Sequence, residues 1–440
     1  MKELLLEVLW EQQQYFASKA LPRAVQLDPD LLKVQVITGP RRAGKSSLLK
    51  LTIDALLRAG VPWNRICYLP LEDERLRTQP FSPDLILQAF RELNPANPLM
   101  QEVYFFFDEI QYLQQWEPFI NRVHEQVSRK VVITGSNSRT LHTEVASVLR
   151  GRGLPVELLP LSFAEFLQFR DIAFADYGHA ASQVKAAFQE YLINGGYPES
   201  LEVGAAKARQ LLQEYFNTVL YRDVIEQQQA ANFSYLRYLF HRIAANTGKN
   251  TALSKIFLEL KSRGYAVSKN SIYQMADLAE AVYLFKRIGR FDPSLIKREN
   301  ADKKSYFIDN GMLRAITGQF SDNKGMLFEN AVFWQLYRQY GNMYTTDIYY
   351  YKDANHECDF VLYAEGGKAL PIQVCWQMDT EETRSREVKG LVKACRITDS
   401  KTGIIITSET EEDIIHNEDI HIKVLPAWKW FVRQYDLFGL

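Results

Sequence analysis

The chain has few cysteines and no long apolar runs. Its four cysteines (Cys67, Cys358, Cys375 and Cys395) form no C-x-x-C pair. The sequence therefore lacks the usual zinc-site and disulfide patterns, and a reducing compartment is indicated. No apolar run approaches about 18 residues, so no membrane span is predicted. The first residues, MKELLLEVLWEQQQYF, carry acids inside their apolar stretch, unlike a secretory signal peptide. We therefore expect a cytoplasmic protein.

An excess of charge of one sign is also missing. The sequence has 52 Lys and Arg against 53 Asp and Glu, and its formal net charge is -1. Attraction to nucleic acid would therefore need a local basic patch. What the sequence does have is length and apolar content, with 440 residues of which 47% are hydrophobic. Because this exceeds one ordinary core, we expect two to four domains.

The stretch GPRRAGKS, from Gly39 to Ser46, has the spacing G-x-x-x-x-G-K-[ST]. It follows the β-branched run VQVIT and precedes SSLLKLTIDALL, which has apolar residues at helical spacing. This strand–loop–helix context predicts a phosphate-binding loop rather than a glycine-rich surface turn. Lys45 would reach the β- and γ-phosphates, and the Ser46 hydroxyl would bind Mg²⁺. The residues predicted to bind the nucleotide are Gly39, Pro40, Arg41, Arg42, Ala43, Gly44, Lys45, Ser46 and Ser47.

A second motif, VYFFFDEIQ, is a hydrophobic strand that ends in two acids. A carboxylate at the C-terminal end of a parallel strand lies in the crevice where such sheets bind ligands. Asp108 would hold Mg²⁺ through water, and Glu109 would orient and deprotonate the attacking water. Two solvated acids after a capped strand are the alternative. The phosphate-binding loop upstream favours the catalytic interpretation.

Four further residues are candidates for the same site. The strand KVVITGSNS ends in Ser136 and Asn137, which could sense the γ-phosphate or could belong to a turn. Arg150 and Arg152 flank a glycine where the last strand of the core should begin. An arginine could stabilise transition-state charge from its own subunit or from a neighbour, and a pair of surface arginines is the alternative.

These motifs resemble the prokaryotic AAA-type ATPases that carry a C-terminal domain of unknown function (the DUF4143 type), which are related to archaeal ATPases. The similarity rests on GPRRAGKSSLL, FFFDEIQ, ITGSNS, LRGR with LPLSFAEFL, YLINGGYPE, YRDVIE, FIDNGML, GMLFENAVFWQL and HECDFVL. It covers nearly the whole chain, in family order. It therefore implies an ATPase that binds and hydrolyses ATP with Mg²⁺.

Beyond the core, residues 166–230 show helical patterns broken by Gly195, Gly196 and Pro198, and we expect a helical lid. Residues 231–315 read as three helices and a β-hairpin, which predicts a winged helix-turn-helix. Seven basic residues between Lys286 and Lys304, against three acids, leave a local charge of +4. DNA binding and protein binding both remain open there, because the predicted recognition helix has a single basic residue, Lys269.

The last block, residues 316–440, alternates helices and strands, and the resemblance implies a restriction-endonuclease-like core. In such cores a helix glutamate, a strand aspartate and an E-x-K pair hold Mg²⁺. Glu329 and Asp359 fit the first two positions, but the pair reads Gln373-Val374-Cys375. A neutral amide is a poor ligand for hard Mg²⁺, and a thiol cannot replace an ammonium. We therefore predict a degenerate nuclease site.

The fold class predicted is α/β: a P-loop NTPase with an AAA+/RecA-like parallel sheet (1–165), then the helical lid, the winged helix and the nuclease-like domain. The leading function is a Mg²⁺-dependent ATPase that moves its C-terminal modules, with DNA as a candidate partner. The alternative is an ATP-gated switch or scaffold that binds a protein partner, with slow turnover and no DNA. A homo-oligomer would be compatible with both.

Overall fold

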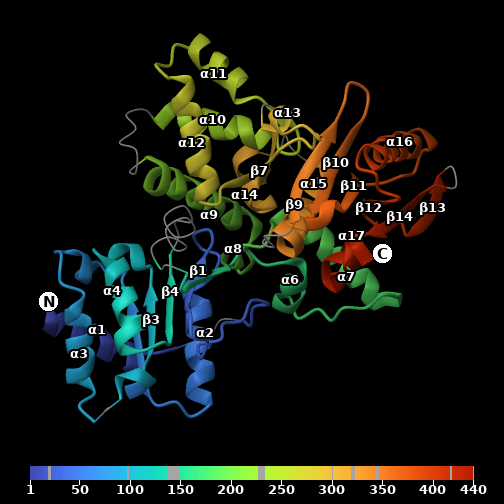
Figure 1. Ribbon diagram of the computed structural model, residues 1–440. Helices are drawn as coiled ribbons and strands as arrows, with labels where there is room; N and C mark the ends of the chain where they lie inside the picture. The colour runs from blue at the N-terminus through green and yellow to red at the C-terminus, as the bar shows by residue number, and fades with distance from the viewer. Residues whose placement is uncertain are drawn as a thin grey trace. The chain divides into compact units, whose positions relative to one another are not determined.

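The computed structural model describes residues 1–17, 21–96, 99–135, 149, 151–225, 233–299, 301–318, 323–341, 346–416 and 419–439. The chain forms two compact units (Figure 1). The first contains residues 1–159 and 281–283, and the second contains residues 160–280 and 284–440. The bounds of the four domains predicted from the sequence stay predictions.

The first unit is built on a parallel sheet with the strand order β2-β3-β4-β1-β5. Its strands are β1 (Val34–Thr38), β2 (Ile66–Pro70), β3 (Tyr104–Asp108), β4 (Val131–Thr134) and β5 (Gly153–Glu157). Strands β1, β3 and β4 are buried along their whole length. Such apolar runs are expected of parallel strands that are covered on both faces. The predicted α/β P-loop fold is confirmed.

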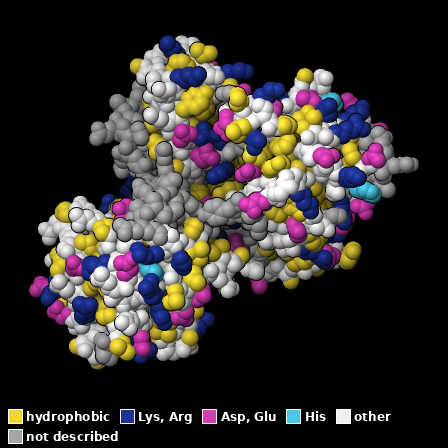
Figure 2. Space-filling view, in the orientation of Figure 1, with side chains coloured by type: hydrophobic (Ala, Val, Ile, Leu, Met, Phe, Trp, Pro, Cys, Tyr) yellow, Lys and Arg dark blue, Asp and Glu magenta, His cyan; other side chains and the backbone are white. Residues whose placement is uncertain are grey.

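Helices cover both faces of this sheet (Figure 1). On one face lie α1 (Lys2–Gln14), α3 (Asp84–Leu93) and α4 (Trp116–Arg122), whose apolar side chains share a core with Phe105 and Phe107. On the other face α2 (Lys45–Arg58) shares a core with Phe106. Because successive strand side chains alternate between faces, the FFF run of β3 serves both cores. Figure 2 shows basic and acidic side chains intermixed over the visible face of this unit.

The second unit begins with helices. They are α6 (Phe163–Phe169), α7 (Gly178–Asn194), α8 (Pro198–Leu201) and α9 (Ala205–Thr218). A capping box starts α6: the Ser162 side chain accepts from the Glu165 backbone N–H, and the Glu165 side chain accepts from that of Ser162. The helices predicted for this region are present.

Three helices and a small antiparallel sheet follow. Their order is α10 (Phe233–Ala245), β6 (Asn250–Thr251), α11 (Leu253–Ser262), α12 (Lys269–Ala281), β7 (Phe285–Ile288), α13 (Leu295–Glu299) and β8 (Lys303–Phe307). The sheet order is β6-β8-β7. The Ser268 hydroxyl accepts from the backbone N–H of Ser271 and caps the start of α12. These elements match the predicted winged helix, whose assignment stays a prediction.

The rest of the second unit is a six-stranded mixed sheet with helices. Its order is β13-β14-β12-β11-β10-β9. The strands are β9 (Thr346–Lys352), β10 (Glu357–Ala364), β11 (Ala369–Cys375), β12 (Thr402–Thr407), β13 (Glu412–His416) and β14 (Ile420–Pro426). The helices are α14 (Asn310–Thr317), α15 (Lys324–Leu336), α16 (Glu381–Ile397) and α17 (Ala427–Arg433). Strands β11, β12 and β14 run parallel, and the other pairs are antiparallel.

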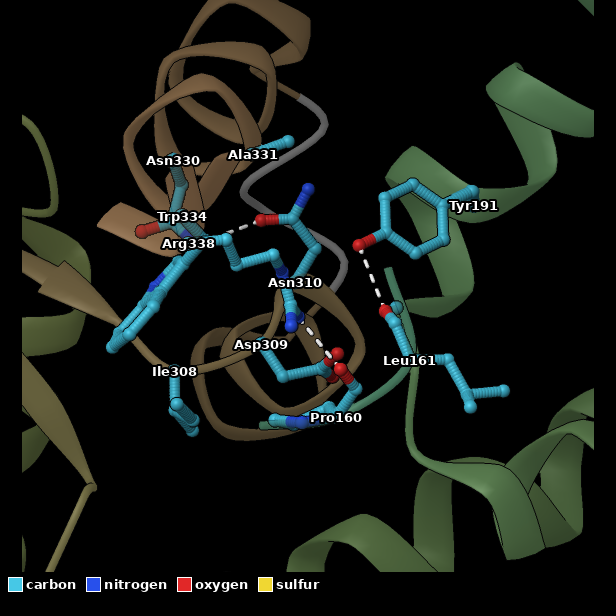
Figure 3. Close-up of a pocket in the computed structure, with 11 residues that line it drawn as sticks. Pro160, Leu161, Tyr191, Ile308, Asp309, Asn310, Asn330, Ala331, Trp334 and Arg338 are labelled. Carbon is cyan, nitrogen blue, oxygen red and sulfur yellow. Dashed lines mark hydrogen bonds between the residues drawn. The ribbon is translucent and has the colours of Figure 1, made fainter. Parts of the chain in front are cut away.

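Two of the sequence motifs meet around a small pocket in this unit (Figure 3). YLINGGYPE supplies Tyr191 and Gly195, and FIDNGML supplies Asp309 and Asn310. The Gly196 backbone N–H donates to Asp309 Oδ2 at 2.7 Å. A Cβ added to Gly195 would lie 2.2 Å from that carboxylate, so glycine is required for this approach. The YLINGGYPE and FIDNGML motifs are therefore packed directly against each other.

Candidate active site

The phosphate-binding loop connects β1 to α2 and depends on two glycines. Gly39 has φ 146°, and a Cβ there would lie 2.1 Å from the Leu158 carbonyl oxygen. Gly44 caps α2 with φ 98°. Side chains at either position would strain the backbone. The loop therefore delivers its chain to the N-terminus of α2, where backbone N–H groups and the helix dipole favour an anion.

Lys45 is buried beneath this loop, with 4% of its side chain exposed. Its Nζ donates to the carbonyl oxygens of Gly39 at 3.2 Å and Pro40 at 3.1 Å. The same ammonium lies 3.7 Å from Glu109 Oε1. The loop lysine and the acid of the second motif, 64 positions apart in the chain, therefore converge on one point as predicted.

Asp108 ends β3 and lies among hydroxyl groups. The Thr134 hydroxyl donates to Asp108 Oδ1 at 2.6 Å. The hydroxyls of Ser46 and Tyr68 lie near this carboxylate. Burial raises the pKa of Asp108, and the bonds from Thr134 and Ser46 oppose that shift. The Thr134 hydroxyl is a neutral donor, so it orients the Asp108 carboxylate without neutralising its negative charge.

Glu109 sits on a constrained backbone beside Asp108. Its φ of 54° is left-handed, which is uncommon for a residue other than glycine. Its N–H donates to the Thr134 hydroxyl at 2.8 Å, and its Oε2 accepts from the Gln111 amide at 2.5 Å. A backbone held in this region by its surroundings is typical of functional sites. Glu109 is thereby fixed with its carboxylate towards Lys45.

Arg23 is a part of the site that sequence reasoning missed. Its guanidinium donates to the Ala43 carbonyl of the loop and to the Leu159 carbonyl, each at 2.8 Å. Tyr68 and Thr134 were missed too. No motif marks Arg23 or Tyr68, whereas Thr134 lies within the ITGSNS motif, of which only Ser136 and Asn137 were considered. A signal for Thr134 was available: it ends the strand that lies between β1 and β3.

The remaining residues predicted for this site are Asn137, Arg150 and Arg152. Asn137 and Arg150 lie outside the described residues. Arg152 precedes β5, and its carbonyl accepts from Val34 N at 2.9 Å. It therefore lies at the start of the parallel strands, whereas Lys45 follows their ends, and its guanidinium pairs with Glu125. Arg152 is not brought to the loop of its own subunit, and a role in a neighbouring subunit stays a prediction.

The oxygen donors at the loop fit Mg²⁺. The Ser46 hydroxyl and the Asp108 carboxylate lie near each other. Mg²⁺ usually keeps several waters and takes one or two carboxylates together with substrate phosphates. A dedicated cage is therefore not expected, and across the described ranges no group of three or more His, Cys, Asp or Glu residues could hold a metal. Ser46 and Asp108 would hold the ion here.

The predicted nuclease-like residues also come together, but around a lysine. Glu329 lies on α15, Asp359 on β10, and Gln373 with Cys375 on β11. Lys304 Nζ lies 3.4 Å from Glu329 Oε1 and 3.3 Å from Asp359 Oδ1. Burial raises the pKa of Glu329, and Lys304 opposes this shift. Sequence reasoning missed Lys304 here, because it had placed that residue in the basic wing.

Comparison with known proteins gives the following matches. Residues 32–167 match the model of an AAA domain, residues 185–323 a domain of unknown function (DUF8612), and residues 324–430 another (DUF4143). The uncharacterised protein MJ1544 of Methanocaldococcus jannaschii is 31% identical over 94% of this chain and 91% of its own length. An uncharacterised protein of Haemophilus influenzae is 28% identical over 81% of this chain and 86% of its own.

Among solved structures, the chain is similar to the Walker-type ATPase PABY2304 of Pyrococcus abyssi. The two are 16% identical, with a TM-score of 0.41, over 72% of this chain and 95% of that one. This overlap is too loose to carry an argument about function. In the parts of the chain that the structure describes, no helix has both the length and the apolar character to cross a membrane.

Proposed function

The chain belongs, with MJ1544, to a family of AAA-type P-loop ATPases, and we propose that it is a Mg²⁺-dependent ATP hydrolase. The observation that carries this proposal is the convergence of Lys45, Ser46, Asp108 and Glu109 at the end of the parallel sheet. Each has the chemistry that phosphoryl transfer to water needs at that place. Water would attack the γ-phosphorus of ATP at this loop, and ADP and inorganic phosphate would then leave.

The contacts of Lys45 suggest how binding and chemistry are linked. Its ammonium is shared between two loop carbonyls and Glu109. A γ-phosphate in the loop would attract that ammonium more strongly than a carbonyl does, because charge-assisted bonds are the stronger ones. Lys45 would then leave Glu109 free to orient and deprotonate water. Mg²⁺, when bound, would neutralise charge on the phosphate oxygens.

ATP turnover by three proteins tests the proposal: wild type, Lys45→Ala and Lys50→Ala. Lys50 lies on the same helix, outside the loop, and serves as the matched control. We expect Lys45→Ala to lose at least about 10²–10³-fold in turnover, since it removes a charge aimed at the transferred phosphoryl group. Lys50→Ala should keep the parental rate. Parental turnover by Lys45→Ala would overturn the assignment.

For the coupled modules we propose movement of the winged-helix and nuclease-like parts, with DNA as the first candidate partner. The basic residues between β7 and β8 support it, but the structure uses several of them internally. Arg287 pairs with Asp277 at 2.5 Å and with Glu280 at 2.7 Å, and Lys304 is buried. Fewer charges are thus available than the +4 predicted from the sequence. A DNA-driven motor should hydrolyse ATP faster with DNA, and more so at low salt.

The second candidate is an ATP-gated switch that binds a protein. It is favoured by Leu295 and Ile296 on α13, which are 63% and 74% exposed. Adjacent large apolar side chains on a surface are more typical of protein contacts than of phosphate contacts. Turnover that is slow and indifferent to DNA would favour this alternative. Particle mass with and without ATP and Mg²⁺ would show whether copies associate, which a trans role of Arg150 or Arg152 requires.

A further inference from the structure

The nuclease-like site contains a buried cation that belongs to the chain itself. Lys304 of β8 has 1% of its side chain exposed. Its Nζ lies 2.9 Å from Glu357 Oε1, 3.3 Å from Asp359 Oδ1 and 3.4 Å from Glu329 Oε1. The ammonium therefore stands at the centre of three carboxylates from α15 and β10. It comes from the hairpin of the predicted winged helix.

Every carboxylate of this group has further partners that are not metals. The Tyr306 hydroxyl donates to Glu329 Oε1 at 2.8 Å. The Val374 N–H donates to Asp359 Oδ2 at 2.9 Å, and Lys352 pairs with Glu357 Oε2 at 2.6 Å. A buried ion pair is stable only when hydrogen bonds satisfy its remaining lone pairs. That condition is met here by side chains and backbone.

The arrangement does not fit the Mg²⁺ that a restriction-endonuclease-like core implies. Mg²⁺ needs oxygens at about 2.0–2.1 Å, whereas these carboxylates surround Nζ at distances typical of hydrogen bonds. The residues at the E-x-K position, Gln373 and Cys375, also make contacts that involve no metal. The Gln373 side chain accepts from Asp359 N at 3.3 Å and donates to Glu387 at 2.6 Å. Cys375 is buried, and its Sγ donates to the Gln377 carbonyl at 3.1 Å.

Backbone from the neighbouring segment also covers the glutamate. Gly248 lies between α10 and β6, has φ 74° and donates its N–H to the Ser305 carbonyl at 3.1 Å. A Cβ added to Gly248 would lie 2.9 Å from Glu329 Oε2. The backbone at Gly248 is therefore packed closely against this oxygen.

We propose that the Lys304 ammonium occupies the cation position of the nuclease-like site and makes it a metal-free structural centre. The centre fastens β8 to α15 and β10, so the hairpin of the predicted winged helix and the nuclease-like sheet move as one body. This goes beyond the ATPase proposal and does not depend on it. The chain then lacks the E-x-K pair but supplies a cation of its own, the Lys304 ammonium, at the same site.

Thermal unfolding of Lys304→Met and Lys303→Met in the full chain tests the proposal. Lys303 is the adjacent, exposed residue of β8 and provides the matched control. Removing one partner from a buried charge cluster is strongly destabilising, so Lys304→Met should lower the unfolding midpoint of the second unit by about 10 °C. Lys303→Met should change it little. Equal midpoints for the two variants would overturn the proposal.

Metal binding gives a second test that does not need Lys304→Met to fold. Mn²⁺ is titrated into nucleotide-free wild type and Asp359→Asn, with both proteins at full length. Any weak binding at the ATP site is common to both and cancels. We expect indistinguishable isotherms, because no Mn²⁺ enters the lysine-filled centre. A Mn²⁺ site present in wild type and lost in Asp359→Asn would overturn the proposal.

Discussion

Two buried lysines, one in each unit, both lie beside acidic residues, but we propose opposite roles for them: one binds a ligand, and the other stabilises the fold. Lys45 is 4% exposed and Lys304 is 1% exposed, and both face acidic residues. Lys45 meets two backbone carbonyls and the Glu109 carboxylate, which lies 3.7 Å from its Nζ. Lys304 meets three carboxylates at 2.9 to 3.4 Å. The Lys45 ammonium therefore lies farther from Glu109 than the Lys304 ammonium lies from its acids, so a closer anion could displace that contact.

The two aspartates differ as well. Asp108 accepts a hydrogen bond from the neutral Thr134 hydroxyl at 2.6 Å. Asp359 Oδ1 lies 3.3 Å from the Lys304 ammonium. Groups that are well oriented but loosely paired suit a ligand site, whereas closely paired charges suit a structural centre.

Glu109→Gln should break the ATP site most sharply while leaving its shape intact. A general base contributes about 10²–10⁴-fold, so we expect turnover to fall by that factor. Nucleotide binding should persist, because the loop and Lys45 remain in place. Steady-state hydrolysis and nucleotide titration measure the two effects separately. A variant that turns over at the parental rate would show that Glu109 is not the base.

Asp309 extends the comparison to a buried carboxylate held by backbone N–H groups. The Gly196 N–H donates to it at 2.7 Å and the Met312 N–H at 2.9 Å. Burial raises the pKa of Asp309 from 3.8 to about 6, although these N–H groups and Arg338 oppose the shift. The folded state thus holds this proton more tightly than the unfolded state does.

The stability contributed by Asp309 should therefore fall as pH rises from about 4 to about 6, by about 3 kcal/mol. Unfolding by denaturant across this range, for wild type and Asp309→Asn, measures the effect. The difference between the two curves should change with pH in this window and be flat above it. Parallel curves throughout would mean that the carboxyl titrates normally in the folded protein.

Thr134→Val should have the smallest effect. It removes the hydroxyl that joins Asp108 to the Glu109 N–H but keeps the shape of the side chain. A lost hydrogen bond to a charged group is worth about 1.5–3 kcal/mol, so turnover should fall by about tenfold or more. Thr52→Val removes another buried hydroxyl, bonded to the Leu48 carbonyl within α2, and is the control. Equal turnover in the two variants would count against the role of Thr134.

The sequence predicted those parts of the protein that lie in continuous segments. The β1 strand, the loop and α2 follow one another along the chain, so local patterns sufficed for Lys45 and Ser46. Asp108 and Glu109 were predicted because Asp108 ends a buried strand and Glu109 follows it. Sheet order, which no local pattern encodes, decides the rest. It brings Tyr68 and Thr134 to Asp108, and it places Arg152 at the far end of the strands.

The predicted nuclease-like site shows the same limit. Glu329 and Asp359 were assigned from the family resemblance, and Gln373 and Cys375 from their departure from the family's E-x-K pair. Lys304 could not be found, because its position depends on the packing of the β7–β8 hairpin against the larger sheet. Part of the basic patch predicted from composition is thus used inside the second unit.

A crystal structure with Mg²⁺ and a non-hydrolysable ATP analogue would test the central claim most directly. The account predicts the β- and γ-phosphates inside loop 39–46, with Lys45 Nζ moved from Glu109 to the γ-phosphate. It also predicts Mg²⁺ on the Ser46 hydroxyl, with a water linking the ion to Asp108. An empty loop, or an ion out of reach of both residues, would contradict it.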